Sequence, residues 1–144
     1  MMSAQRPDPN PTDEVRPFWD GLRRREFLLL RCDHCGRWRW PVAGCREHAN
    51  DPYLANLKWS AASGRGRVFA YTVQHVPFHP AFAVPYVYAL IELEEGPVMV
   101  SNVVGCDPKD VYIDMPVQVV FEEINDAYTI PLFAPAQLES SSTV

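Results

Sequence analysis

The stretch CDHCGRWRWPVAGCREH at residues 32–48 decides how the first third of the chain folds. It holds two pairs of candidate metal ligands, each with two residues between its members: Cys32 with Cys35, and Cys45 with His48. Three thiolates and one imidazole form a tetrahedral donor set of a structural zinc site, in which no position stays open for water. A bound ion would replace the hydrophobic core that so short a segment cannot build. The stretch therefore predicts a zinc ribbon with these four ligands.

Other interpretations of the same residues stay open at the level of sequence. Cys45 and His48 could be unrelated to the first pair, or the Cys-x-x-Cys pair could be redox-active, although it lacks the βαβ setting of such motifs. His34 is a rival ligand, but it lies inside the first turn, where binding would strain the chelate. Cys106 is distant in the sequence and is interpreted as a small buried residue or a bystander.

The residues before this stretch predict a helix followed by a strand. Residues 17–25 (PFWDGLRRR) favour a short helix, because a proline suits the first turn and arginines suit the carboxyl-terminal end. One apolar face of that helix would consist of Phe18, Trp19 and Leu22. Residues 26–31 predict a strand that enters the first cysteine pair.

The residues after the stretch change to a pattern typical of sheet. Turns rich in Gly, Pro, Asn and Asp separate five predicted strands, at residues 66–76, 86–93, 98–104, 117–124 and 127–130. Five strands with a long connection between the third and the fourth fit a five-stranded Greek-key barrel of the OB type. A small open sandwich would produce a similar pattern.

These elements predict a mainly β chain in four parts. The parts are a flexible arm (1–12), a short N-terminal helix with the zinc ribbon (13–56), the OB-type barrel (57–134) and a flexible tail (135–144).

Charge is spread unevenly along the chain. Twelve of the 13 Lys and Arg residues lie at or before Arg67, against eight acids, so residues 1–67 carry a net charge of +4. Residues 68–144 carry one Lys and ten acids, a net charge of −9. This asymmetry favours contact between the first half and an anion or an acidic surface. Chance, with ordinary solvation of the charges, is the alternative.

Bulk properties indicate a globular protein outside the membrane. No apolar run approaches the roughly 20 residues that a membrane-spanning helix needs, and the N-terminal residues lack the apolar stretch of a signal peptide. A cytoplasmic location is therefore expected. In a reducing compartment four cysteines suggest a metal before a disulfide.

Seven segments follow one another in a specific order: FWDGLRRREFLLLRCDHCG, WRWP, CREH, SGRGRVFAYT, VPYVYALIELEEG, NVVGCDPKDVYIDMPVQVVFEEI and TIPLF. In this order they resemble the acyl-CoA-associated family that joins a rubredoxin-like zinc ribbon to an OB fold. The resemblance covers all but the first dozen and last ten residues. It departs from the family pattern at His48, where many members have a fourth cysteine, but zinc accepts either ligand.

The resemblance implies an accessory function. Members of this family are commonly non-catalytic partners of thiolase-superfamily enzymes, including thiolases, aldolases and acyltransferases. We therefore expect a zinc-containing subunit that forms a hetero-oligomer with a thiolase-like enzyme acting on acyl-CoA. No G-x-S-x-G elbow or paired His motif accompanies the free candidates Cys106, His75 and His79, so catalysis by the chain alone is not expected. A hidden hydrolase or hydratase activity is a third possibility.

Candidate contacts with coenzyme A and with the partner follow from residue chemistry. Arg65 and Arg67 could bind phosphate, because guanidinium forks match phosphate oxygens, and Trp59, with Trp38 and Trp40, could stack on adenine. The predicted partner surface consists of Phe18, Trp19, Leu22, Arg23, Arg24 and Arg25. The alternatives are that SGRG is only a turn, that the arginines are solvated and that the tryptophans belong to the core.

The alternative function is binding of single-stranded nucleic acid. Zinc ribbons and OB folds both bind nucleic acid with basic grooves and stacked aromatic side chains, and the segment RWRW at residues 37–40 is compatible with that. A barrel region with a net charge of −9 is not, because neutralisation of phosphates dominates such affinity. Nucleic acid is therefore not the expected partner.

Overall fold

The structure is a computed structural model that describes residues 5–41, 43–48 and 55–136. The outermost parts of the predicted arm and tail, residues 1–4 and 137–144, lie outside this range. In chain order the elements are η1 (Asp13–Val15), α1 (Arg16–Arg23), β1 (Leu28–Cys32), β2 (Trp38–Arg39), η2 (Arg46–His48), β3 (Leu57–Ala61), β4 (Arg65–Gln74), β5 (Tyr86–Leu93), β6 (Val98–Val103), η3 (Pro108–Asp110), β7 (Pro116–Glu123) and β8 (Thr129–Pro135), where η marks a 3-10 helix.

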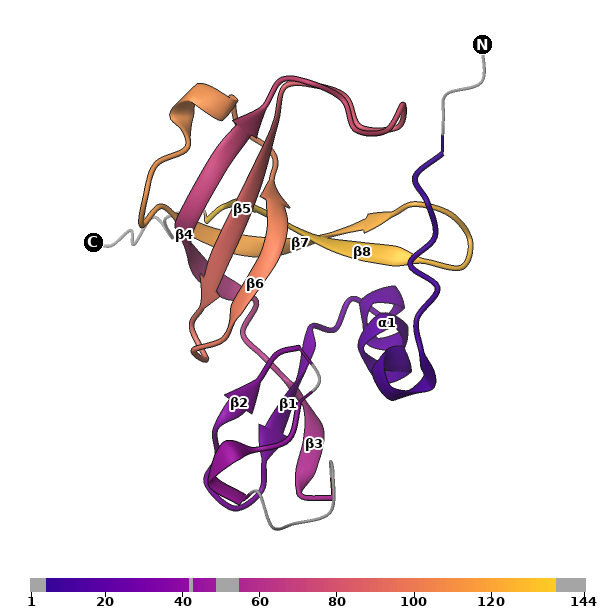
Figure 1. Cartoon of the computed structure of the whole chain (residues 1–144), viewed down its shortest axis with the longest axis vertical. Coiled ribbons are helices and arrows are strands. Elements are labelled where there is room, and N and C mark those ends of the chain that lie inside the picture. Colours follow the sequence, from indigo (N-terminus) through magenta and orange to yellow (C-terminus); the bar gives the residue numbers. More distant parts are fainter. Residues whose placement is uncertain (1–4, 42, 49–54, 137–144) are drawn as a thin grey trace, which may run out of the picture.

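Strands β4 to β8 form a closed barrel in the order β4-β5-β6-β8-β7 (Figure 1). The pairing of β4 with β7 closes it, and all neighbours are antiparallel except β6 and β8, which pair in parallel through Val103 and Phe133. This order confirms the predicted five-stranded Greek-key barrel and excludes the open sandwich. Among the described residues no helix is long and apolar enough to cross a membrane.

Alternation of side chains builds the core of the barrel. In β5 every second residue is buried, and the same holds in β6. Because successive side chains of a strand point to opposite faces, one face fills the barrel and the other turns outward. The buried positions of these two strands are Val87, Ala89, Ile91, Leu93, Met99, Ser101 and Val103.

The last strand is longer than the sequence predicts. A short strand is expected at 127–130, whereas β8 runs over Thr129–Pro135. Proline cannot donate a backbone hydrogen bond and is therefore uncommon inside a strand. The strand continues through Pro131, which pairs in register with Phe121 of β7, while β8 joins β6 through only one pair of residues.

Strand β3 belongs to the ribbon and not to the barrel. The ribbon sheet has the order β2-β1-β3, and β1 pairs with β3 along five consecutive residues, from Leu28 with Ala61 to Cys32 with Leu57. The expectation that the barrel begins at residue 57 is therefore wrong: its first strand begins at Arg65. Alternation along a strand shows that a strand exists but does not show which sheet it joins.

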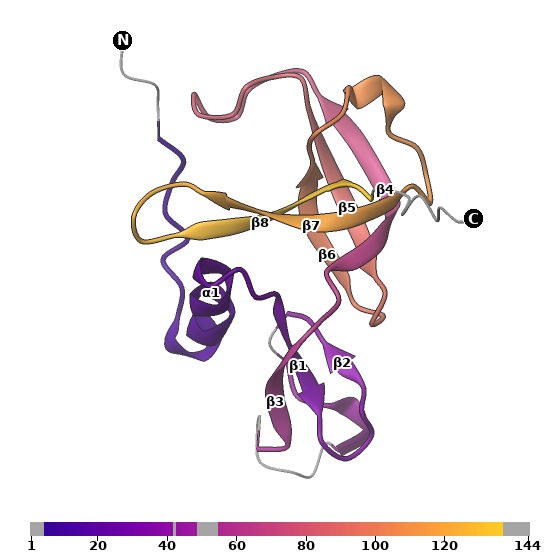
Figure 2. The ribbon, with the colours of Figure 1, turned by 180° about the vertical axis from the view of Figure 1, so that it is seen from behind.

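Helix α1 joins the ribbon to the barrel. Phe18 and Leu22 are 2% and 0% exposed, and they lie in one core cluster with barrel residues such as Phe133. Phe27 links the two sides, because its ring lies 6.2 Å from the rings of both Phe18 and Phe133. Gly21 lets Leu28 pack against the helix, since a Cβ at this position would lie 2.9 Å from the Leu28 Cδ1 atom. Figure 2 shows α1 beside β8, with the ribbon sheet on the same side of the barrel.

Candidate metal centre

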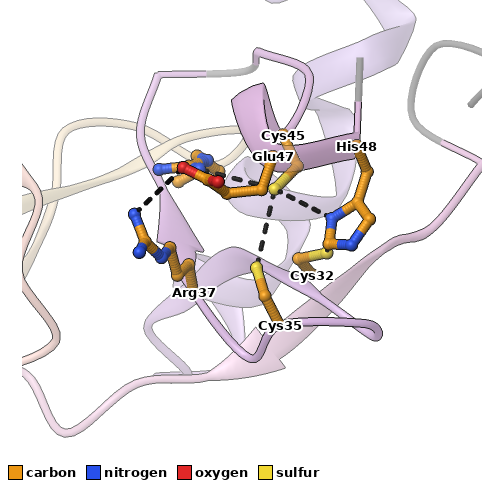
Figure 3. A network of polar contacts seen from close by, with 7 residues as sticks. Cys32, Cys35, Arg37, Cys45, Glu47 and His48 are labelled. Atoms are coloured by element: carbon orange, nitrogen blue, oxygen red, sulfur yellow. Dashed lines mark hydrogen bonds and ion pairs between the residues drawn. The ribbon is translucent and has the colours of Figure 1, made fainter. Parts of the chain in front are cut away.

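The two ligand pairs predicted from the sequence converge in the ribbon (Figure 3). Cys32 ends β1, Cys35 lies in the following turn, Cys45 directly precedes the short helix η2, and His48 is the last residue of η2. Their ligand atoms all lie within 4.8 Å of one another. The Sγ atoms of Cys35 and Cys45 are 3.6 Å apart, and His48 Nδ1 lies 3.4 Å from Cys32 Sγ and 3.5 Å from Cys45 Sγ.

These separations fit a tetrahedral metal ion. With metal–sulfur bonds of ~2.3 Å and metal–nitrogen bonds of ~2.0 Å, a tetrahedron has S···S edges of about 3.8 Å and S···N edges of about 3.5 Å. The three separations given above agree with those edges to within a few tenths of an ångström. Both the donor atoms and their spacing could therefore hold one metal ion.

Local backbone geometry brings the first pair together. Gly36 has φ +74°, a left-handed conformation that glycine adopts without steric cost. Its N–H donates to the Cys32 carbonyl oxygen at 2.9 Å, and the Cys32 N–H donates to the Arg37 carbonyl oxygen at 2.8 Å. Beside the cluster, Arg37 pairs with Glu47 at 3.4 Å and so connects the first turn to η2 (Figure 3).

Two further side chains contact the thiols, and no pattern in the sequence indicates either of them. Asn56 Nδ2 donates to Cys32 Sγ at 3.2 Å, and an Arg39 N–H donates to Cys45 Sγ at 3.4 Å. Such outer contacts orient metal ligands and stabilise thiolates. Asn56 is 24 residues from Cys32, and only the pairing of β1 with β3 brings it near. A search by ligand type also passes over it, because an amide is not a usual zinc ligand.

Electrostatics favours a thiolate at Cys45. The hydrogen bond with His48 is the largest effect; burial opposes it, and Arg39 adds to it, so the pKa of Cys45 falls to about 6. The same contact with Cys45 raises the pKa of His48. Because the thiolate is the form that binds metal, this position is prepared for a cation at neutral pH.

The pKa values of the other two thiols shift in opposite directions. Burial is the largest effect on Cys32 and raises its pKa, but hydrogen bonds from the backbone of Cys35 and His34 outweigh it and lower the pKa overall. For Cys35 the largest effect is a hydrogen bond from the backbone of Arg37, which lowers the pKa. Burial and the two neighbouring thiols raise it by more in total, so the net shift is upward. Negative charge on adjacent sulfurs disfavours a third thiolate, and a bound cation would remove that conflict.

The rival ligands lie outside the cluster. His34 is exposed and stacks on the His48 ring, with 4.7 Å between ring centroids, but it is not part of the four-residue group. Cys106 is partly buried in the connection between β6 and β7. Burial, followed by the charges of Asp110 and Asp107, raises the pKa of its thiol.

The predicted phosphate contacts already have carboxylate partners. Arg65 Nε donates to Glu94 at 3.0 Å, while Arg67 donates to Glu92 at 2.7 Å and pairs with Asp114 at 3.1 Å. Trp59 lies on β3 in the ribbon, where it packs against both core clusters. It does not line the hollow beside the two arginines, so a contact with coenzyme A stays a prediction.

The glycines of the SGRG segment have a structural use. Gly64 is buried with φ +77°, and a Cβ there would lie 2.5 Å from the Val119 side chain. A Cβ on Gly66 would lie 2.7 Å from the Glu92 carbonyl oxygen. Both glycines therefore allow β4 to approach its neighbours β7 and β5 where the barrel closes.

The predicted partner surface is divided by the fold. Phe18 and Leu22 are buried in the chain's own core, which corrects the expectation that they face a partner. Trp19 is partly buried and packs on the same core. The three arginines that follow are exposed, and each contacts the chain itself: Arg23 with the Asp126 carbonyl oxygen, Arg24 with Glu26 and Arg25 with Glu123.

Comparison with known proteins now places the fold in a family. Residues 59–122 match the model of a family described as the C-terminal OB-fold domain of ChsH2. A DUF35 domain-containing scaffold protein of Methanocaldococcus jannaschii is 37% identical over 111 residues, which cover 75% of this chain and 77% of that protein. The chain belongs to the DUF35 family.

This DUF35 chain covers very different shares of two further relatives. A probable enoyl-CoA hydratase alpha subunit of Thermomonospora curvata is 36% identical over 141 residues, which cover 96% of this chain but 43% of the relative. The chain thus spans less than half the length of that protein. A chain of the solved structure of an "Ltp2-ChsH2(DUF35) aldolase" matches with a TM-score of 0.78 and 34% identity, over 89% of this chain and 98% of the other.

Proposed function

We propose that this DUF35 chain is a non-catalytic, zinc-containing accessory subunit that binds and completes an enzyme acting on acyl-CoA. The match to a chain of the "Ltp2-ChsH2(DUF35) aldolase" over 98% of that chain's length carries the proposal. The name of that aldolase joins a DUF35 component to a second component. The name of the Thermomonospora curvata relative adds a subunit of an enoyl-CoA enzyme.

The partner in this proposal is a thiolase-superfamily enzyme, such as a thiolase, an aldolase or an acyltransferase, in a hetero-oligomer with this chain. The chemistry of the described side chains supports an outside source of catalysis. Burial and two nearby carboxylates raise the pKa of the Cys106 thiol and so disfavour its thiolate. His79 Nδ1 accepts a hydrogen bond from the Ala81 N–H and thereby stabilises its own loop.

Zinc is the metal proposed for the ribbon. Cys32, Cys35 and Cys45 would bind through sulfur and His48 through Nδ1, and this mixed set suits zinc. With four protein ligands the ion would be structural: it would fix η2 and the first turn against β1. The ribbon in turn shares Trp59 with the core that contains α1 and the barrel.

Co-expression with a thiolase-like protein encoded beside the gene tests the proposal. We expect the two chains to co-purify in a fixed ratio, and we expect turnover of an acyl-CoA to require both. A tagged barrel protein of unrelated family serves as the control for non-specific capture. Turnover by the isolated chain, abolished by one substitution, would instead establish a hidden enzyme.

Binding of single-stranded nucleic acid is the alternative, and the observed ion pairs argue against it. Several arginines of the basic first half are paired with carboxylates, among them Arg25, Arg37, Arg65 and Arg67. Phosphates would have to displace these carboxylates. Affinity for nucleic acid depends mainly on cationic side chains that are available to neutralise phosphates. In a gel-shift assay at low salt we expect no shift of a single-stranded DNA or RNA, and tight binding would favour the alternative.

A further inference from the structure

A hollow of about 550 Å³ lies on the outer side of the barrel, away from the metal cluster. Its floor comes from the outward faces of three neighbouring strands, because Thr72 of β4, Tyr88 of β5 and Asn102 of β6 face one another in register. Its sides come from the loop between β4 and β5. Figure 1 shows this loop reaching from the barrel toward the chain segment that precedes α1.

The walls of the hollow are apolar and largely aromatic. Four aromatic side chains line it, and two of them are strongly exposed: Phe78 to 78% and Tyr88 to 47%. Val76 and Val84, in the same loop, are 65% and 38% exposed. A concentration of exposed apolar side chains around one concave site indicates that something covers it in the working protein.

The polar groups of the hollow specify what could occupy it. Among the described residues that line it, Arg6 is the only charged one, and none is an acid. The Arg6 guanidinium lies 5.1 Å from the centre of the Phe82 ring and 3.9 Å from Glu122, so it is held at the wall by one stacking contact and one loose ion pair. The site therefore complements an apolar body that carries a polar or anionic group.

A second hollow adjoins the first at Tyr88. Tyr88 and Asn102 also line this second hollow of about 310 Å³, which reaches Trp19, Val100 and Pro131. Small-molecule sites usually have volumes of ~300–1,000 Å³, and both hollows lie within that range. An acetyl group would leave most of this space empty.

We propose that this hollow binds the apolar acyl group of a medium-chain or longer acyl-CoA, with Arg6 beside its polar end. The inference rests on the proposed function, which supplies acyl-CoA as the class of ligand. It adds the size of the acyl group and the face of this subunit that binds the group. The hollow would then contribute to the selection of acyl length.

Calorimetric titration of the full chain with coenzyme A, acetyl-CoA, hexanoyl-CoA and decanoyl-CoA tests the inference. Complete burial of four methylene groups would raise affinity ~200-fold. In this open hollow we expect hexanoyl-CoA to bind at least about tenfold more tightly than acetyl-CoA, and decanoyl-CoA more tightly again. Equal affinity along the series would overturn the inference.

A substitution that fills the hollow sharpens the test. Ala83 is an exposed lining residue of the loop, so Ala83→Trp adds bulk there without entering the core. Ile113→Trp is the matched control, because Ile113 is 53% exposed and does not line the hollow. We expect Ala83→Trp to lower the affinity for decanoyl-CoA to that for acetyl-CoA and Ile113→Trp to have no effect, with unchanged melting temperatures.

The outcomes separate this inference from the proposed function. If the enzyme complex forms and is active but affinity does not depend on acyl length, the inference fails and the accessory function stands. If Ala83→Trp blocks assembly with the enzyme and leaves acyl-CoA binding unchanged, the face is occupied by the partner protein, and the inference is wrong. If the chain binds longer acyl groups more tightly but no co-expressed enzyme co-purifies with it or needs it for turnover, the inference stands and the accessory function does not.

Discussion

Cys45 shows how contacts of a single residue prepare a metal ligand. It is 3% exposed, and its sulfur has His48 Nδ1 at 3.5 Å and an Arg39 N–H at 3.4 Å. Burial alone would keep a thiol protonated, but these two contacts supply positive charge next to the sulfur and reverse the effect. At the residue scale, the environment of the ligand is already adapted to a cation.

Metal binding should weaken in mildly acidic solution. The pKa of Cys45 is lowered to about 6, so its thiolate persists at neutral pH and is protonated as the pH falls through that value. The pKa of His48 is raised, so a proton competes with the metal there at a higher pH than for an ordinary histidine. Zinc release to a colorimetric chelator, followed from about pH 8 to pH 5, should increase as the pH drops through this range. Release that is independent of pH would contradict this assignment.

The substitution Cys35→Ala should remove the metal while leaving the barrel folded. Cys35 is exposed, so the loss of packing is small, and the barrel strands make their hydrogen bonds among themselves. We expect metal content measured by mass spectrometry to fall to near zero and co-purification with the enzyme partner to fail, while the β-sheet circular dichroism is kept.

Cys106→Ala is the matched control for that experiment, because it removes a thiol outside the cluster and should keep both metal and partner. A Cys35→Ala chain that lacks zinc but assembles normally would show that the ribbon does not organise the complex.

At the scale of elements, the sequences of α1 and β4 do not determine which group each element packs against. The amphipathic pattern of α1 predicts a buried face, but burial can occur against a partner or against the chain itself. The structure shows the second, because α1 packs against β1 and β8. Gly64, just before β4, and Gly66 within it similarly allow a close approach, and the approaching group is a neighbouring strand.

The substitution Leu22→Ala should destabilise the free chain. Leu22 is fully buried, and removal of such a side chain leaves a cavity that typically costs about 2–5 kcal/mol. Unfolding in urea measures this loss, with the exposed residue change Arg23→Ala as the control, which should alter stability by less than about 0.5 kcal/mol. If Leu22→Ala instead weakened only partner binding, the helix face would belong to the interface as the sequence suggested.

The substitution Gly66→Ala should destabilise the barrel rather than weaken ligand binding. The added Cβ would lie 2.7 Å from the Glu92 carbonyl oxygen and 2.9 Å from the Ile91 side chain, so β4 and β5 must separate. Overpacking of this kind costs about 1–3 kcal/mol. Thermal unfolding should show a lower melting temperature, whereas the exposed change Gln118→Ala on β7 should not.

A phosphate-binding role of the SGRG segment predicts a different outcome for Gly66→Ala. In that case Gly66→Ala would keep its melting temperature and lose affinity for coenzyme A.

At the scale of the whole molecule, the ribbon, α1 and the barrel share one core. The largest core cluster contains Phe18 and Leu22 of α1 together with Val68 and Phe133 of the barrel, and Trp59 of the ribbon packs against it. The outer face of the barrel, in contrast, leaves an apolar hollow exposed. The molecule therefore has one shared interior and an exposed apolar face suited to a ligand or an assembly partner.

At this scale the folded chain also pairs many of the charges that the sequence separates into two halves. The sequence places excess positive charge before residue 68 and excess negative charge after it. Folding joins the two halves, because Arg25 pairs with Glu123, Arg65 with Glu94 and Arg67 with Glu92. Much of the asymmetry is thus used within the chain, and it is weaker evidence for an anionic partner than the sequence implied.

The sequence by itself determined the features that depend on short spacing. The four candidate ligands occupy 17 residues, so their convergence follows from two turns and can be predicted from residue type. The strands of the barrel are similarly local, because alternation of apolar and polar residues identifies a strand wherever it later pairs. The bounds predicted for β5 are the observed ones.

Only the tertiary structure decided which distant segments meet. The assignment of β3 to the ribbon, the contact of Asn56 with Cys32, the inward face of α1 and the carboxylate partners of Arg65 and Arg67 all depend on contacts between residues more than twenty positions apart. A local pattern states what a residue can bury or pair with, but many partners satisfy it equally well. The choice among them is made by closure of the barrel and by the core that it shares with the ribbon, because these bury the most apolar surface at once.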